Sequence, residues 1–156
     1  MSRRIHRAWM PRHARGVGLI EVMVSLVVLA VGLLGIAAMQ SMALRGGQGS
    51  LESTQAVMAT NSILEVIRAN RAQADSYNMA KTCVAPAAGG TIAGADKNAW
   101  ITSLKTTIGT AGDTTTCGQI ANCDDANATN CTITVFWDDS RAGGSTAREL
   151  RVEGQI

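Results

Sequence analysis

The sequence has 156 residues, which suits one modest domain and leaves no room for a second core. Of its 14 basic residues five lie within the first 16 positions, so residues 17–156 carry nine basic and 12 acidic side chains, a net charge of −3. Both histidines, His6 and His13, also lie in the first segment, which removes imidazole as a general base or metal ligand from the rest of the chain. Catalysis is therefore not the expected role.

The chain begins with a basic segment and continues with a long apolar run. From Val22 to Met39 every residue is apolar or small except Ser25, a length close to what a helix needs to cross the hydrocarbon core of a bilayer. Arginines beside such a segment stay on the cytoplasmic side, so the C-terminal bulk is expected outside the cytoplasm. Glu21 stands at the entrance of the run, and a carboxylate there is costly unless it has a partner.

The segment from Gly16 to Glu21 resembles the class III signal of type IV pilins and type II secretion pseudopilins. It combines a basic leader, Gly16, a glutamate at the fifth position after it, and an unbroken apolar run. The resemblance implies that a prepilin peptidase cuts between Gly16 and Val17, that Val17 is then N-methylated, and that Glu21 acts in assembly. Val17 departs from the phenylalanine usual at that position. No catalytic residue, cofactor or metal is implied.

Two ordinary interpretations compete with this signal. A secretory signal peptide would be cut on the far side of its apolar core, for which residues 37–39 are a candidate because Ala37 and Ala38 are small. A plain signal anchor would keep the whole segment. The run is longer than a typical signal core and carries Glu21 at its entrance, and both features favour cleavage after Gly16.

The chain is thus expected to consist of a cytoplasmic leader (1–16), the transmembrane half of a long helix (17–44) and a periplasmic pilin-like domain (45–156). Gly46, Gly47 and Gly49 interrupt the helical pattern, and each glycine costs a helix interior about 1 kcal/mol relative to alanine. Either two helices meet here or one long helix has soft points, and the resemblance favours the second.

A helical pattern follows at about 50–75, and its apolar face is expected to pack on a sheet. That face consists of Ala56, Val57, Ile63, Leu64, Ile67 and Ala74. Residues 76–94 are expected to form a loop. A short helix is predicted at about 96–108, capped by Asp96, ending at a left-handed Gly109, and placing Trp100, Leu104 and Ile108 on one face.

The last third is predicted to form strands. Residues 131–138 alternate, with Ile133, Val135 and Trp137 on one face, and residues 148–153 alternate with Leu150 and Val152 inward. Gly143 and Gly144 supply the turn between them. The predicted fold class is α+β: a pilin-like fold with a long N-terminal helix on a small antiparallel sheet and a disulfide-bearing C-terminal region.

Three segments resemble PilV-type minor pilins, namely residues 67–71, the tryptophan-bearing short helix and residues 134–139. The resemblance implies a minor pilin that primes assembly, lies in or near the pilus tip and supports twitching motility or adhesion. Its partners would be the prepilin peptidase, other minor pilins, the major pilin and the inner membrane. The alternatives are a type II secretion minor pseudopilin and a signal-anchored extracytoplasmic binding module or enzyme.

Four cysteines lie in the expected periplasmic domain, and an even number outside the cytoplasm indicates disulfides. Three pairings are possible. The favoured one joins Cys117 to Cys123 across a short loop and Cys83 to Cys131. A zinc site is disfavoured, because separations of 34, 6 and 8 positions include no close pair.

Calcium and nucleic acid are also disfavoured as ligands. Residues 124–130 contain two acids, but they lack the spaced acids, glycine and final glutamate of a calcium loop. Basic residues are scattered, and the one local group, Arg141, Arg148 and Arg151, is interleaved with acids.

Overall fold

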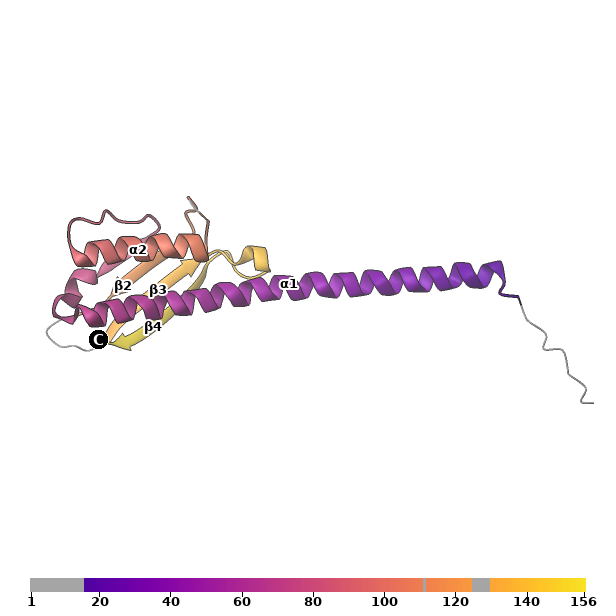
Figure 1. The fold of residues 1–156 in the computed structure, drawn as a ribbon, viewed down its shortest axis with the longest axis horizontal. Helices are drawn as coiled ribbons and strands as arrows, with labels where there is room; N and C mark the ends of the chain where they lie inside the picture. Colours follow the sequence, from indigo (N-terminus) through magenta and orange to yellow (C-terminus); the bar gives the residue numbers. More distant parts are fainter. Residues whose placement is uncertain (1–15, 111, 125–129) are drawn as a thin grey trace, which may run out of the picture. The chain divides into compact units, whose positions relative to one another are not determined.

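The computed structural model describes residues 16–110, 112–124 and 130–156 (Figure 1). The chain divides into two compact units, Met1–Gln40 and Ser41–Ile156. Helix α1 (Leu19–Ala69) contributes residues to both units and continues through Gly46 and Gly47 without interruption. Of the two possibilities that the glycines left open, one long helix is therefore correct.

The second half of α1 presents the predicted apolar face to the core. Its buried residues are Ala56, Thr60, Ile63, Leu64 and Ile67, which follow the spacing of one helix face. Val57 was expected on this face, but it is 42% exposed. The helix ends at Ala69, earlier than expected, and the 3-10 helix η1 (Arg71–Tyr77) carries the buried Ala74.

Helix α2 (Ile92–Thr107) begins four residues before the predicted start at Asp96. The cap is Thr91, whose Oγ1 accepts a hydrogen bond from Gly94 N at 3.0 Å, so the prediction of Asp96 as cap was wrong. Asp96 instead accepts a hydrogen bond from the hydroxyl of Tyr77 at 2.7 Å. The predicted left-handed exit at Gly109 was wrong as well, because Gly109 has no positive φ.

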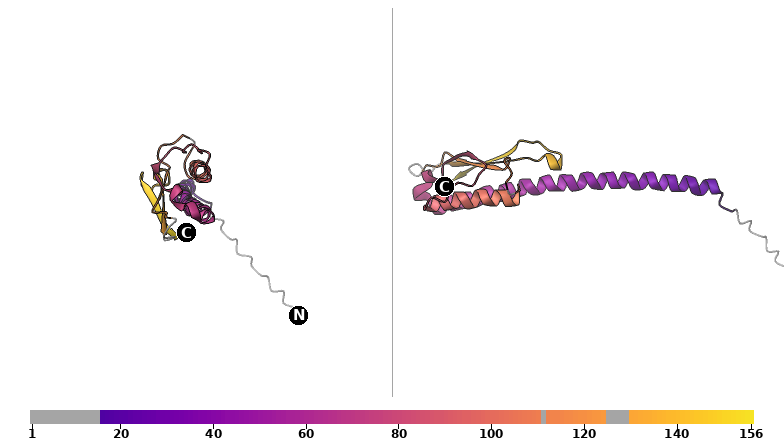
Figure 2. Two further views of the ribbon diagram at one scale, coloured as in Figure 1. Left: turned by 90° about the vertical axis from the view of Figure 1, so that its left-hand side faces the viewer. Right: turned by 90° about the horizontal axis from the view of Figure 1, so that it is seen from above.

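Trp100 joins α2 to α1. Its side chain is buried, as are Leu104 and Ile108, which confirms the predicted apolar face. The indole Nε1 donates a hydrogen bond to the backbone oxygen of Ala59 at 3.0 Å. Within the 41–156 unit the two helices therefore form one layer, with the sheet forming the other (Figures 1 and 2).

In the part of the chain that the structure describes, the sheet has four antiparallel strands in sequence order. They are β1 (Met79–Thr82), β2 (Cys117–Ala121), β3 (Asn130–Trp137) and β4 (Arg148–Gln155). β3 and β4 were predicted, and Ile133, Val135 and Trp137 are buried as expected. β1 and β2 were missed, because each is short and neither shows a run of alternating β-branched residues.

Two disulfides join Cys83 to Cys117 and Cys123 to Cys131, so the pairing favoured from the sequence was wrong. The strand register explains the difference. Thr82 of β1 pairs with Gly118 of β2, which brings Cys83 opposite Cys117 with a Cα–Cα distance of 4.0 Å. Cys117 is the first residue of β2 and Cys123 follows its last residue by two positions, so the extended strand keeps these two cysteines apart.

The second disulfide lies at the other end of β2. Ala121 pairs with Thr132 of β3, and Asn122 then turns with a φ of 59°, which brings Cys123 beside Cys131 at a Cα–Cα distance of 4.4 Å. Asn78 holds Cys123 in place, because its side chain accepts from Cys123 N and donates to Cys123 O at 3.0 and 2.8 Å.

We expect peptide mapping without reduction to recover Cys83 linked to Cys117 and Cys123 linked to Cys131. Each bond should stabilise the fold by about 2–4 kcal/mol. Replacing Cys83 and Cys117 by serine should cost about 1 kcal/mol more than replacing Cys123 and Cys131, because the bond closes a longer loop. Denaturant unfolding measures that difference. A peptide joining Cys117 to Cys123 would contradict the register argument.

Asp113 organises the turn between α2 and β2. Its carboxylate accepts hydrogen bonds from the backbone N–H groups of Thr110, Thr115 and Thr116 at 3.0, 2.8 and 2.6 Å. Burial would raise the pKa of Asp113, but the hydrogen bonds from Thr116, Thr110 and Thr115 and the charge of Lys105 lower it to about 2.

Asp113→Ala should therefore destabilise the protein by about 1–2 kcal/mol at neutral pH, because three N–H donors lose their acceptor. A lowered folded-state pKa stabilises the fold above the ordinary value of 3.8, and that contribution is lost as the pH falls toward about 2. Denaturant unfolding at several pH values should show the variant and the wild type converging in acid. Asp75→Ala is the control, because Asp75 is exposed. If the free energies of unfolding of Asp113→Ala and the wild type differed by the same amount at every pH, this explanation would be refuted.

Candidate functional site

The candidate site begins where α1 begins. Gly16, Val17 and Gly18 precede the helix, which begins at Leu19. The backbone oxygen of Gly18 accepts hydrogen bonds from the N–H groups of Glu21 and Val22 at 2.9 and 3.3 Å. Glu21 therefore lies in the first turn, where its negative charge interacts favourably with the helix dipole.

The apolar side chains that follow Glu21 have no cover within the described chain. Val22, the least exposed of the large apolar residues up to Met39, is 46% exposed, and Leu34 is 72% exposed. The helix is long and apolar enough to cross a membrane, and its most apolar window is not buried. The core helix of a soluble protein would be buried, whereas this exposed surface suits lipid or contact with other apolar helices.

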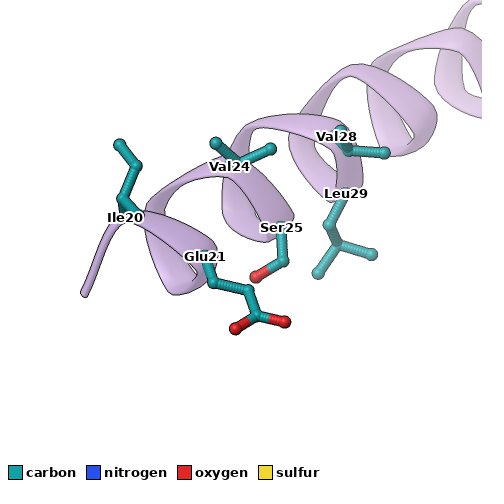
Figure 3. A pocket seen from close by; sticks show the side chains of 6 residues that line it. All are labelled: Ile20, Glu21, Val24, Ser25, Val28 and Leu29. Atoms are coloured by element: carbon teal, nitrogen blue, oxygen red, sulfur yellow. The ribbon is translucent and has the colours of Figure 1, made fainter. Parts of the chain in front are cut away.

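Glu21 lies among apolar neighbours on one face of the helix. Its carboxylate extends beside Ser25 and Leu29, and Ile20, Val24 and Val28 complete a shallow, open depression (Figure 3). Ser25 Oγ donates a hydrogen bond to Val22 O at 2.8 Å. Among the residues that the structure describes, no cation forms an ion pair with Glu21. The carboxylate is thus free to accept a partner from outside this part of the chain.

Nothing in the described fold requires glycine at position 16. A Cβ on Gly16 would meet no atom within 4 Å, and the residue does not adopt a positive φ. A Cβ on Gly18 would make only an ordinary contact with Ile20, at 3.8 Å. If glycine is needed at position 16, the reason lies in a molecule that acts on the chain.

Ser25 is the residue of this site to which the sequence drew least attention. It was noted only as a polar interruption of an apolar run. Ser25 follows Glu21 by four residues, about one helical turn, so the two side chains lie on the same face (Figure 3). This spacing is visible in the sequence and could have identified Ser25 as a neighbour of Glu21.

The other candidate sites give no support for a metal or nucleic acid. Within the described ranges, no group of three or more histidine, cysteine or acidic residues could hold a metal ion. Residues 125–129, which include most of the calcium candidate, lie outside the described residues. Arg141, Arg148 and Arg151 each approach an acid, namely Glu52, Asp139 and Glu153 respectively.

Comparison with known proteins finds one family motif, and it covers this N-terminal site. The family model described as the prokaryotic N-terminal methylation motif matches residues 11–37, which include Gly16, Glu21 and most of the apolar run. No curated protein and no solved structure matches the chain significantly. The long N-terminal helix, the small antiparallel sheet and the two disulfides form a pilin-like α+β fold. Motif and fold together support membership of the type IV pilin and pseudopilin family.

Proposed function

We propose that this protein is a minor type IV pilin that helps prime pilus assembly and is incorporated in or near the pilus tip. The observation that carries the proposal is the uncovered apolar surface of α1 directly behind the matched methylation motif. Such a helix can be stored in a membrane and later packed against the same helix of other subunits. Membership of this family suggests a structural rather than an enzymatic protein.

The motif implies processing by a prepilin peptidase. In this proposal the enzyme cuts between Gly16 and Val17, and Val17 is then N-methylated. Before assembly the chain spans the inner membrane once, with residues 45–156 in the periplasm, as the arginines of the leader favour. Afterwards it lies in a pilus at the cell surface, with other minor pilins and the major pilin as partners, and supports twitching motility or adhesion.

A type II secretion minor pseudopilin is the main alternative, because it would carry the same N-terminal motif. The disulfide-bearing C-terminal region and the resemblance of residues 67–71 and 134–139 to PilV-type proteins favour the pilus. A signal-anchored binding module is the third possibility. It would have no use for cleavage after Gly16.

Gly16→Val should block processing and leave full-length precursor in the inner membrane. The peptidase must fit the backbone at the cut, and the described fold supplies no other reason for glycine there. Immunoblotting of membrane fractions separates precursor from mature chain by the 16-residue leader. Gly18→Ala, which adds a methyl group without strain, is the control and should be processed. Mature-sized Gly16→Val protein would contradict the proposal.

Glu21 should act in assembly through its charge. In a bundle of apolar helices an unpaired carboxylate is costly, and a cation is its natural partner. Cleavage before Val17 creates such a cation, the new amino terminus, on this subunit or on a neighbour. Pairing of the two charges at low dielectric would set the axial register between helices.

Glu21→Ala should therefore be cleaved and inserted normally, yet co-purify about tenfold less with the other subunits that carry the same motif, as expected for a lost charge pair. Quantitative mass spectrometry of affinity-purified inner-membrane complexes gives the ratio. Ser25→Ala, on the same helix face, is the matched control and should be recruited as the wild type is. Recovery of Glu21→Ala at the wild-type level would refute the pairing.

A further inference from the structure

The connection between β3 and β4 approaches α1 through two carboxyl groups. The side chain of Asp139 is 2% exposed, and its Oδ2 accepts a hydrogen bond from Arg148 Nη1 at 2.6 Å. Its other oxygen, Oδ1, is buried and has no hydrogen-bond partner among the described residues. The same is true of Oε2 of Glu52 on α1. Buried acceptors of this kind are costly unless a donor reaches them.

Several contacts place the two carboxyl groups in the same region of the fold. A Cβ on Gly49, three residues before Glu52 on the same helix, would lie 3.1 Å from Asp139 Oδ1. Arg141, in the 3-10 helix η2 (Ser140–Ala142) that follows Asp139, places Nη2 3.8 Å from Glu52 Oε1. Gly144 lies so close to the Asp139 carboxyl group that a Cβ there would clash with it.

The electrostatics of Glu52 agree with this geometry. Burial and then the negative charge of Asp139 raise the pKa of Glu52 above the ordinary value of 4.5. The nearness of the Asp139 carboxyl group and the charge of Asp138 raise it further, whereas the charge of Arg141 lowers it. A hydrogen bond between two carboxyl groups requires a proton on one of them, because an ionised carboxylate can only accept.

We propose that Glu52 retains a proton that it shares with Asp139, and that this proton fastens the β3–β4 connection to α1. The charges around Glu52 and Asp139 are consistent with one negative charge and one proton on the pair. Arg148 balances Asp139 at 2.6 Å, whereas the cation that approaches Glu52 within the described residues is Arg141, which is 64% exposed and 3.8 Å away. Thr107 at the end of α2 and Ile108 directly after it line the hollow beside Glu52, and neither residue titrates.

The shared proton would also stabilise the packing of the β3–β4 connection on the glycine-containing part of α1. A Cβ on Gly46 or Gly47 would meet no atom within 4 Å, whereas at Gly49 the nearest atoms belong to Asp139 and Ala142. The β3–β4 connection is therefore what packs on this turn among the described residues. Loss of the proton would place two negative charges near each other, one on the buried Asp139 and one on the partly buried Glu52, and would loosen both the connection and the turn.

The sign of the pH dependence follows from the raised pKa of Glu52. The contribution to stability is complete below the ordinary value of 4.5, and it is lost as the pH rises through the folded-state value. The contact between the β3–β4 connection and α1 is therefore more stable in acid than at alkaline pH.

Hydrogen exchange and thermal unfolding of the full chain in detergent micelles test the proposal. In the wild type, exchange at residues 139–144 and 46–52, corrected for intrinsic rates, should accelerate at least about threefold between mildly acidic and mildly alkaline pH. Glu52→Gln should remove this dependence and raise the unfolding temperature at alkaline pH, because its neutral amide can donate to Asp139. Glu65→Gln, at an exposed ion pair on the same helix, is the control and should keep the wild-type dependence.

An ionised Glu52 bound to Arg141 predicts the opposite results. Glu52→Gln would then lower the unfolding temperature at every pH, and Arg141→Gln would detach the connection even in acid. Either result would overturn the proposal, as would a Glu52→Gln variant with the wild-type pH dependence. The shared proton instead predicts that Arg141→Gln leaves the connection attached in acid and that Glu52→Ala, which offers no donor, is less stable than Glu52→Gln.

Discussion

The apolar surface of α1 between Val22 and Met39 is the main physical constraint on where this chain can reside. Each large apolar side chain gains about 1.5–3 kcal/mol on leaving water, and this segment leaves nearly all of them uncovered. Lipid or a bundle of like helices would cover this surface. The 41–156 unit needs no such cover, because its helices and sheet already enclose a core of their own.

Two glutamates on the same helix then meet opposite conditions. Glu21 stands at the apolar end with no ion-pair partner among the described residues, so an external cation is the natural complement. Glu52 has a buried Oε2 near Asp139 although its side chain is 15% exposed, and the proton that we propose there is its natural complement. The first carboxyl group suits association between chains, and the second suits attachment within one chain. Gly46, Gly47 and Gly49 lie between them on α1.

Much of this organisation could be predicted from local sequence patterns. The spacing of Ile63, Leu64 and Ile67 predicted the buried helix face, and the alternation through Ile133, Val135 and Trp137 predicted β3, because both patterns repeat over several residues. The short strands β1 and β2 offered no such repeat. The disulfide pairing depended on their register and was missed for that reason. The role of Asp139 required knowledge of which turn of α1 the β3–β4 connection approaches.

We propose that cleavage after Gly16 creates the amino terminus through which this subunit assembles. Mass spectrometry of filaments sheared from the cell surface tests it most directly. We predict that the N-terminal peptide of this chain begins at Val17 and carries a methyl group on its amino nitrogen. Absence of the chain from the filaments, an intact leader, or a terminus near residues 37–39 would contradict the account.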